Sequence, residues 1–86
     1  MDKYEYKTIN DEKYEISYYH FKIGKDIFLC RVTQEIECGE CYFDIATTAK
    51  EYESEDLYLD EDVMIYKSEF DALYEKYEHL FEIDTF

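Results

Sequence analysis

The chain has 86 residues, a formal net charge of −14 and a hydrophobic share of 47%, with 11 tyrosines and no proline. A chain of this length forms one domain, residues 1–86, and the hydrophobic share indicates a folded core rather than a disordered acidic tail. Such a negative charge repels nucleic acid and anionic membranes and attracts basic protein surfaces. We therefore expect a protein partner, with no direct binding of nucleic acid or membrane.

The N-terminal sequence MDKYEYKTINDEKYE has no apolar stretch like that of a signal peptide. No apolar run approaches the ~18 residues of a membrane span. The chain has three cysteines, and an odd number fits a reducing compartment better than a disulfide framework. These features predict a cytoplasmic protein.

Alternating hydrophobic and polar residues in the first half predict β-strands. Short breaks at 24–26 and 37–40, each with one glycine, predict tight hairpin turns. The result is a three-stranded antiparallel meander, to which residues 3–9 would add a fourth, edge strand. The predicted strands of the meander are residues 13–23, 27–36 and 41–47.

The C-terminal part predicts an amphipathic helix. Ser68 is a favourable N-cap residue, and Asp71 three residues later resembles a capping box. Apolar side chains then recur on one helical face, which we expect to pack on one face of the sheet. The predicted fold class is therefore α+β. That apolar face comprises Phe70, Leu73, Tyr74, Tyr77, Leu80 and Phe81.

The region between the last predicted strand and the helix is harder to assign. Thr47 or Thr48 is suited to cap a short helical turn through Ala49–Glu53. Residues 63–66, an apolar run, fit either a strand or the lead-in to the helix.

The most unusual stretch is EYESEDLYLDED, residues 51–62, called the acidic segment below. It contains no basic residue. One interpretation is a surface that imitates nucleic acid, because a protein that binds phosphates with Lys and Arg will accept carboxylates placed along a similar path. The alternative is a solvated loop without a role. The acids of the segment are Glu51, Glu53, Glu55, Asp56, Asp60, Glu61 and Asp62.

Four further acids, Asp71, Glu75, Glu78 and Glu82, fall on one flank of the predicted helix and are called the helix acids. Like charges at i,i+4 destabilise a helix by about 0.2–0.5 kcal/mol per pair, and we expect no lysine to relieve them on this flank. Such an arrangement favours a binding role, and we expect the helix acids to extend the acidic surface.

Tyr52 and Tyr58 lie between the carboxylates of the acidic segment. Aromatic rings among acids suit an interface that meets Arg side chains, through cation–π contacts and hydrogen bonds. The alternative is that these rings anchor the segment to the core. Both interpretations remain open from the sequence.

Cys38 and Cys41 form a Cys-x-x-Cys pair, to which Cys30 and His20 would add two further zinc ligands. The alternative is a buried Cys30 that packs as a small apolar residue and two turn thiols without a partner. We expect neither a metal nor another cofactor. The chain has no phosphate-binding loop or nucleophile motif, and its two histidines are far apart, so we do not expect an enzyme.

In its acidic segment, its helix acids and its sheet-plus-helix layout, the chain resembles small phage-encoded inhibitors that mimic DNA. These include anti-CRISPR proteins, uracil-DNA glycosylase inhibitors and anti-restriction proteins. The resemblance is one of class, and it carries no individual residue over. It implies a stoichiometric inhibitor that occludes a basic DNA-binding or PAM-reading groove. The favoured partner is a type II CRISPR effector nuclease, in the cytoplasm of an infected bacterial host.

Two other classes fit the same sequence. An immunity protein or antitoxin that neutralises a basic nuclease toxin is also small, acidic and rich in tyrosine. A zinc-stabilised interaction module with an incidental charge is the third.

Overall fold

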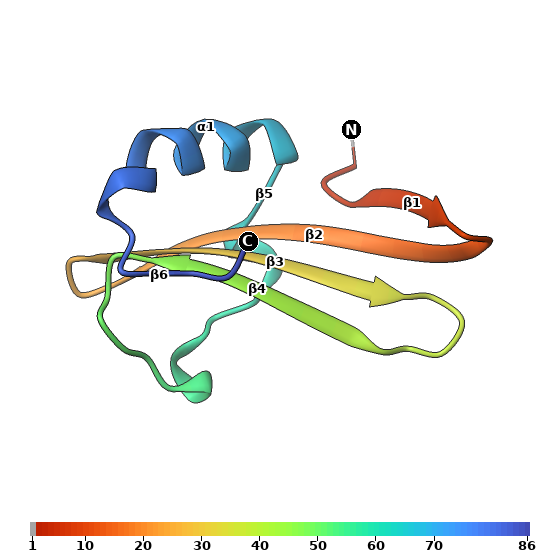
Figure 1. The fold of residues 1–86 in the computed structure, drawn as a ribbon, viewed down its shortest axis with the longest axis horizontal. Helices are drawn as coiled ribbons and strands as arrows, with labels where there is room; N and C mark the ends of the chain where they lie inside the picture. Colours follow the sequence, from red (N-terminus) through yellow and green to blue (C-terminus); the bar gives the residue numbers. More distant parts are fainter. Residues whose placement is uncertain (1) are drawn as a thin grey trace.

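The computed structural model describes residues 2–86 and shows an antiparallel sheet with one α-helix above it (Figure 1). Short 3₁₀-helices interrupt the second half of the chain. The strands are β1 (Glu5–Ile9), β2 (Glu12–Ile23), β3 (Asp26–Glu35), β4 (Cys41–Thr47), β5 (Met64–Ile65) and β6 (Ile83–Asp84). The helical elements are η1 (Ser54–Asp56), η2 (Glu61–Val63), α1 (Lys67–Tyr77) and η3 (Glu78–Leu80).

The strand order is β1-β2-β3-β4-β6, and every pairing is antiparallel. β5 also pairs with β2, opposite Tyr18 and Tyr19, so β1 and β5 share one edge of that long strand. Positive φ angles at Asn10 (51°) and Asp11 (67°) form the β1–β2 turn, as a type I′ hairpin requires. Gly24, at φ 61°, forms the next turn without steric cost.

The α+β class and the antiparallel meander are confirmed, but the predicted number of strands is too low. Residues 3–9 do contribute an edge strand, β1. The sequence pattern predicts neither β6 nor the strand conformation of β5, because two residues are too short to show a period. The helical turn predicted through 49–53 is wrong, since the first turn forms later, at η1.

The helix also begins and ends earlier than predicted. Its N-cap is Tyr66, whose carbonyl accepts from the Phe70 N–H at 3.0 Å, so Ser68 is not the N-cap. β5 fixes the point at which the chain leaves the sheet, and the helix starts directly after it. The α-helix ends at Tyr77, and a 3₁₀ turn continues to Leu80. No helix within residues 2–86 has the length and apolar content that crossing a membrane requires.

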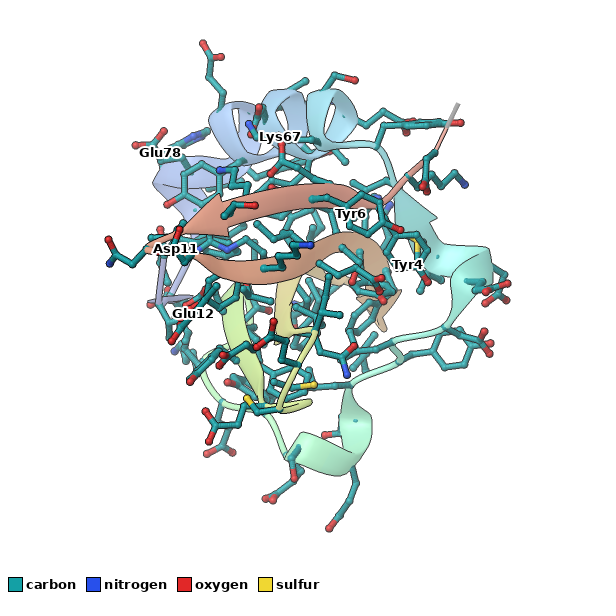
Figure 2. All side chains as sticks on the ribbon, turned by 90° about the vertical axis from the view of Figure 1, so that its right-hand side faces the viewer. Tyr4, Tyr6, Asp11, Glu12, Lys67 and Glu78 are labelled. Carbon is teal, nitrogen blue, oxygen red and sulfur yellow. The ribbon has the colours of Figure 1, made fainter. Side chains whose placement is uncertain are left out.

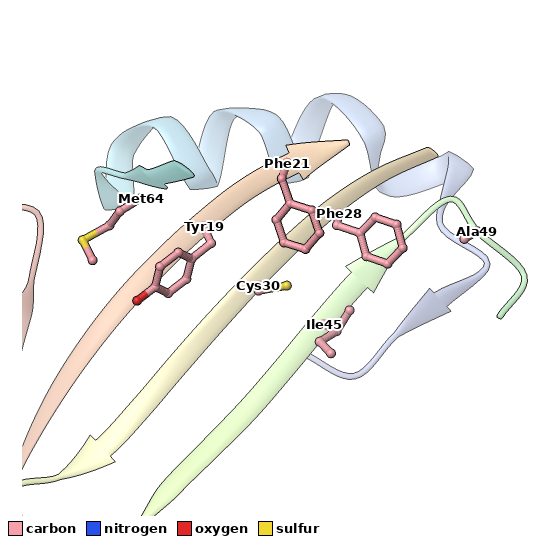
Figure 3. Packing of buried hydrophobic residues seen from close by; sticks show 7 residues of the cluster. All are labelled: Tyr19, Phe21, Phe28, Cys30, Ile45, Ala49 and Met64. Atoms are coloured by element: carbon pink, nitrogen blue, oxygen red, sulfur yellow. The ribbon is translucent and has the colours of Figure 1, made fainter. Parts of the chain in front are cut away.

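Both faces of the sheet carry a hydrophobic cluster, because β2 and β3 alternate large apolar side chains. On one face, α1 packs with its single buried side chain, Phe70, against the sheet. The acidic segment packs on the other face, whose buried cluster is shown in Figure 3. The buried residues on the helix side are Ile16, Tyr18, Leu29, Ala46 and Phe70. Those on the other side are Tyr19, Phe21, Phe28, Cys30, Ile45, Ala49 and Met64.

Replacement of Phe70 by alanine should destabilise the protein by about 3–5 kcal/mol, the usual cost of removing a buried phenylalanine. The ring is 5% exposed, and its centroid lies 4.9 Å from that of Tyr18. Urea unfolding followed by circular dichroism measures the change. Leu80→Ala is the control, since Leu80 is 51% exposed and should change the free energy of unfolding by less than about 0.5 kcal/mol. Equal losses in the two variants would contradict this assignment of the core.

Candidate protein-binding surface

The acidic segment is held against the sheet by its own apolar side chains. Tyr52, Leu57 and Leu59 are partly buried and pack on the cluster beneath the segment. The Tyr52 ring meets the buried Phe28 ring edge-on, with the centroids 6.0 Å apart. Tyr52 is therefore an anchor of the segment, the second of the two roles left open for it.

All seven acids of the segment are exposed. Within residues 2–86, ion pairs join Lys7 to Glu5, Arg31 to Asp44 and Lys67 to Asp71, and none of them involves the segment. The segment therefore presents concentrated negative charge without a basic partner in the described chain.

Some of these carboxylates shape the backbone that displays them. Glu53 and Asp56 form a capping box around η1, in which the Glu53 N–H donates to Asp56 Oδ2 at 3.2 Å. The Asp60 carboxylate accepts from the Glu61 N–H at 2.6 Å and caps η2. These bonds fix local conformation while the carboxylates stay in solvent.

Tyr58 organises two more carboxylates. Its ring is 48% exposed, and its hydroxyl donates to Asp62 Oδ2 at 3.2 Å and lies 3.4 Å from Asp60 Oδ2. The hydrogen bond to Asp62 and the nearby negative charges raise the pKa of Tyr58. Tyr58 thus holds Asp60 and Asp62 close together. Tyr58 lies two residues before Asp60 and four before Asp62, and this spacing was a sequence signal for the arrangement that was not used.

The helix acids occupy a different environment. Asp71, Glu75 and Glu78 line a hollow of about 330 Å³ together with Arg31 and Phe86. Lys67 Nζ lies 2.8 Å from Asp71 Oδ2, so the expectation that no lysine relieves this flank is wrong. Because α1 ends at Tyr77, Glu78 lies in η3 and Glu82 lies beyond it, and the four acids do not continue one helical flank.

The acidic segment and the helix acids lie on opposite sides of the sheet. Figure 1 shows η1 below the sheet and α1 above it, and Figure 2 shows the same arrangement from the end, with Lys67 and Glu78 on the α1 side. The two hydrophobic clusters under these elements face in opposite directions. The two groups of acids therefore do not form one continuous surface, and the acidic segment is the stronger candidate.

The structure does not assemble the zinc ligands considered from the sequence. Cys30 is 1% exposed within the core, and burial raises its pKa to about 12. Cys30 pairs with Tyr19 and Leu29 pairs with His20, which places His20 and Cys30 on opposite faces of the sheet.

A different set of metal-ligating atoms meets at the β3–β4 turn. Ligand atoms of Glu35, Cys38 and Glu40 lie within 4.8 Å of one another. The Cys38 thiol donates to Glu35 Oε2 at 3.0 Å, and this bond raises the pKa of Cys38. The pairing favours the protonated thiol, whereas a metal binds the thiolate.

An apolar hollow adjoins the acidic segment. It has a volume of about 550 Å³ and lies between β4 and the segment. The sequence pattern does not predict this hollow, because it forms only where the segment folds back over the strand. We call it the β4 hollow; its lining residues are Phe43, Ile45, Tyr52, Ser54, Leu57 and Leu59.

No family model matches the chain, and comparisons with curated proteins and with solved structures found no match. A proposal for its function therefore rests on the charge, exposure and packing described above.

Thiol labelling should separate the cysteines into two classes. Cys38 and Cys41 are exposed and should react with a disulfide reagent in the native protein. Cys30 is buried and has a raised pKa, so it should react only after unfolding. A Cys38→Ser/Cys41→Ser variant should not react with the reagent until denaturant is added. A fast-reacting third thiol in the native protein would contradict the burial of Cys30.

Alkaline pH should destabilise the fold through its tyrosines. Burial and the Glu5 charge raise the pKa of Tyr18 to about 12, and a hydrogen bond to Asp84 does the same for Tyr74. Tyrosines in the unfolded chain ionise near their ordinary value of 10.0. Because the pKa values of Tyr18 and Tyr74 are higher in the folded protein, their contribution to stability is fully present below about pH 10. It is lost as the pH rises toward 12.

The measurement is the urea midpoint at neutral pH and at about pH 11. The midpoint should fall, and the fall should be smaller in a Tyr18→Phe/Tyr74→Phe variant. A midpoint that is constant over this range would contradict the assigned shifts.

Proposed function

We propose that this chain is a stoichiometric inhibitor of a basic nucleic-acid-binding protein, and that the acidic segment occupies the place of the nucleic-acid backbone. The favoured partner is a type II CRISPR effector nuclease, which gives the chain a phage anti-defence role. The observation that carries this proposal is the set of seven exposed carboxylates without an ion-pair partner among residues 2–86.

Unpaired charge of one sign costs stability, because the carboxylates repel one another. A basic groove that normally holds phosphates offsets this cost when it binds them. Lys and Arg side chains in such a groove bind the row of negative charges along the nucleic-acid backbone. This electrostatic contribution to affinity does not require base-specific contacts.

The way the segment is held also supports the proposal. The partly buried Tyr52, Leu57 and Leu59 fix it to the sheet, and the bonds at η1 and η2 fix its turns. A surface that is ordered before binding loses less conformational entropy when the complex forms. The acidic segment therefore suits tight binding better than a disordered acidic tail of the same composition.

The test is competition for the guide-loaded effector. Binding should be 1:1, should weaken steeply with salt, and should exclude duplex DNA that carries the PAM. Binding that leaves DNA binding intact would overturn mimicry and favour an immunity-type complex. The absence of any salt-sensitive binding to nucleic-acid-binding proteins would indicate that the acidic segment is a solvated loop without a binding role.

Charge reversal provides the matched prediction. Glu51, Glu55 and Glu61 make no capping bond to the backbone, so changing all three to lysine should leave the fold intact. The affinity of this triple variant for the effector should fall by on the order of 100-fold, or about 2.7 kcal/mol.

The control variant changes Glu69, Glu75 and Glu82 to lysine. These residues lie on the opposite side of the sheet and are also exposed, so the net charge changes by the same amount. This control should lose less than about tenfold, through long-range electrostatics alone. Equal losses in the two variants, with circular dichroism unchanged, would show that net charge matters and the acidic segment does not.

A further inference from the structure

We infer that the β4 hollow receives an apolar side chain from a Lys- and Arg-rich segment of the partner protein. This inference rests on the proposed function and adds a second recognition element to it. The acidic segment attracts and orients a basic surface, and the hollow selects the surface that carries an apolar residue between its cations.

The hollow exists because the acidic segment covers only part of β4. Ile45 is 6% exposed under the segment, whereas Phe43, two residues earlier on the same face of the strand, is 54% exposed. β6 pairs with Ala46 and Thr47 only, and no strand among residues 2–86 pairs with the outer edge of β4 before them. Phe43 therefore forms an open apolar wall.

The lining sets the chemistry of the occupant. Five of the six lining side chains are aromatic or aliphatic, and Ser54 is the exception. A hollow of about 550 Å³ has room for a large apolar side chain and the backbone beside it. Burial of such a side chain against Phe43 and Leu57 removes apolar surface of both partners from water.

The rim sets the charge of the occupant. Ser54 lines the hollow and belongs to η1, and the exposed acids Glu53, Glu55 and Asp56 are its neighbours in the sequence. Cationic residues on either side of the apolar one would meet these acids. A second copy of this chain is a poor occupant, because it carries the same charge of −14 and its acids would repel those of the rim.

The two elements should act on different steps of binding. Charge on the rim mainly accelerates encounter, and its effect is screened by salt. A buried apolar anchor mainly slows dissociation, as interface hot spots do. Loss of the anchor should therefore shorten the lifetime of the complex without changing the salt dependence of association.

The probes are two synthetic peptides, Arg-Lys-Leu-Lys-Arg and Arg-Lys-Ser-Lys-Arg, with both ends blocked. They have the same charge and differ only in the central side chain. Titration followed by heteronuclear NMR should show the leucine peptide binding about tenfold more tightly. Only the leucine peptide should shift the side-chain resonances of Phe43 and Leu59.

Phe43→Ser should abolish the preference for leucine. Tyr42→Ser is the matched control, because Tyr42 is 51% exposed on the adjacent position and points to the opposite face of β4. Tyr42→Ser should keep the preference. Since both side chains are about half exposed, neither variant should unfold, and circular dichroism checks this.

Equal affinity of the native protein for the two peptides, or the absence of binding by either, would overturn the inference. Retention of the leucine preference by Phe43→Ser would also overturn it. These outcomes leave the proposed function standing, because that function is tested separately, by competition with DNA for the effector and by the lysine variant at Glu51, Glu55 and Glu61.

Discussion

The structure depends on one constraint: both faces of the β2–β3 pair are apolar, and α1 covers one of them. Phe28 and Cys30 face one way, and Leu29 between them faces the other. The second cover is the acidic segment, through Tyr52, Leu57 and Leu59. The residues that carry the densest charge are therefore interleaved with residues that close the core, and this segment cannot detach without exposing Phe28 and its neighbours to water.

Tyrosine explains how a chain with few lysines tolerates so many carboxylates. A phenol hydroxyl donates a hydrogen bond to a carboxylate and leaves its charge in place, whereas an ion pair with lysine would cancel it. The protein thus keeps its field while its acids are positioned. The pairs are Tyr14 with Glu12, Tyr18 with Glu5, Tyr42 with Glu40, Tyr58 with Asp62, and Tyr74 with Asp84.

Much of the fold follows from local patterns, and much of the candidate site does not. Alternation along 13–23 and 27–36 predicted these two strands, because each side chain there packs as its position in the pleat dictates. β5, β6 and the helix N-cap at Tyr66 depend on pairing between distant residues. The β4 hollow likewise forms between segments that are distant in the sequence. The Lys67–Asp71 pair is local, at i,i+4, and it was not predicted because the helix was expected to begin after Ser68.

The short strands β5 and β6 have a consequence for the order of folding. β1 to β4 are joined by hairpins and close through contacts that are local in sequence. β5 pairs with β2, and β6 with β4, across long stretches of chain that contain other strands and helices, and each pairing has only two residue pairs. Such late, small contacts lie at the low-stability end of a structure, where amide protons exchange through local opening. We therefore expect the meander to form before these two pairings, and the β5 end of the loop that carries the acidic segment to open more readily than β2 and β3.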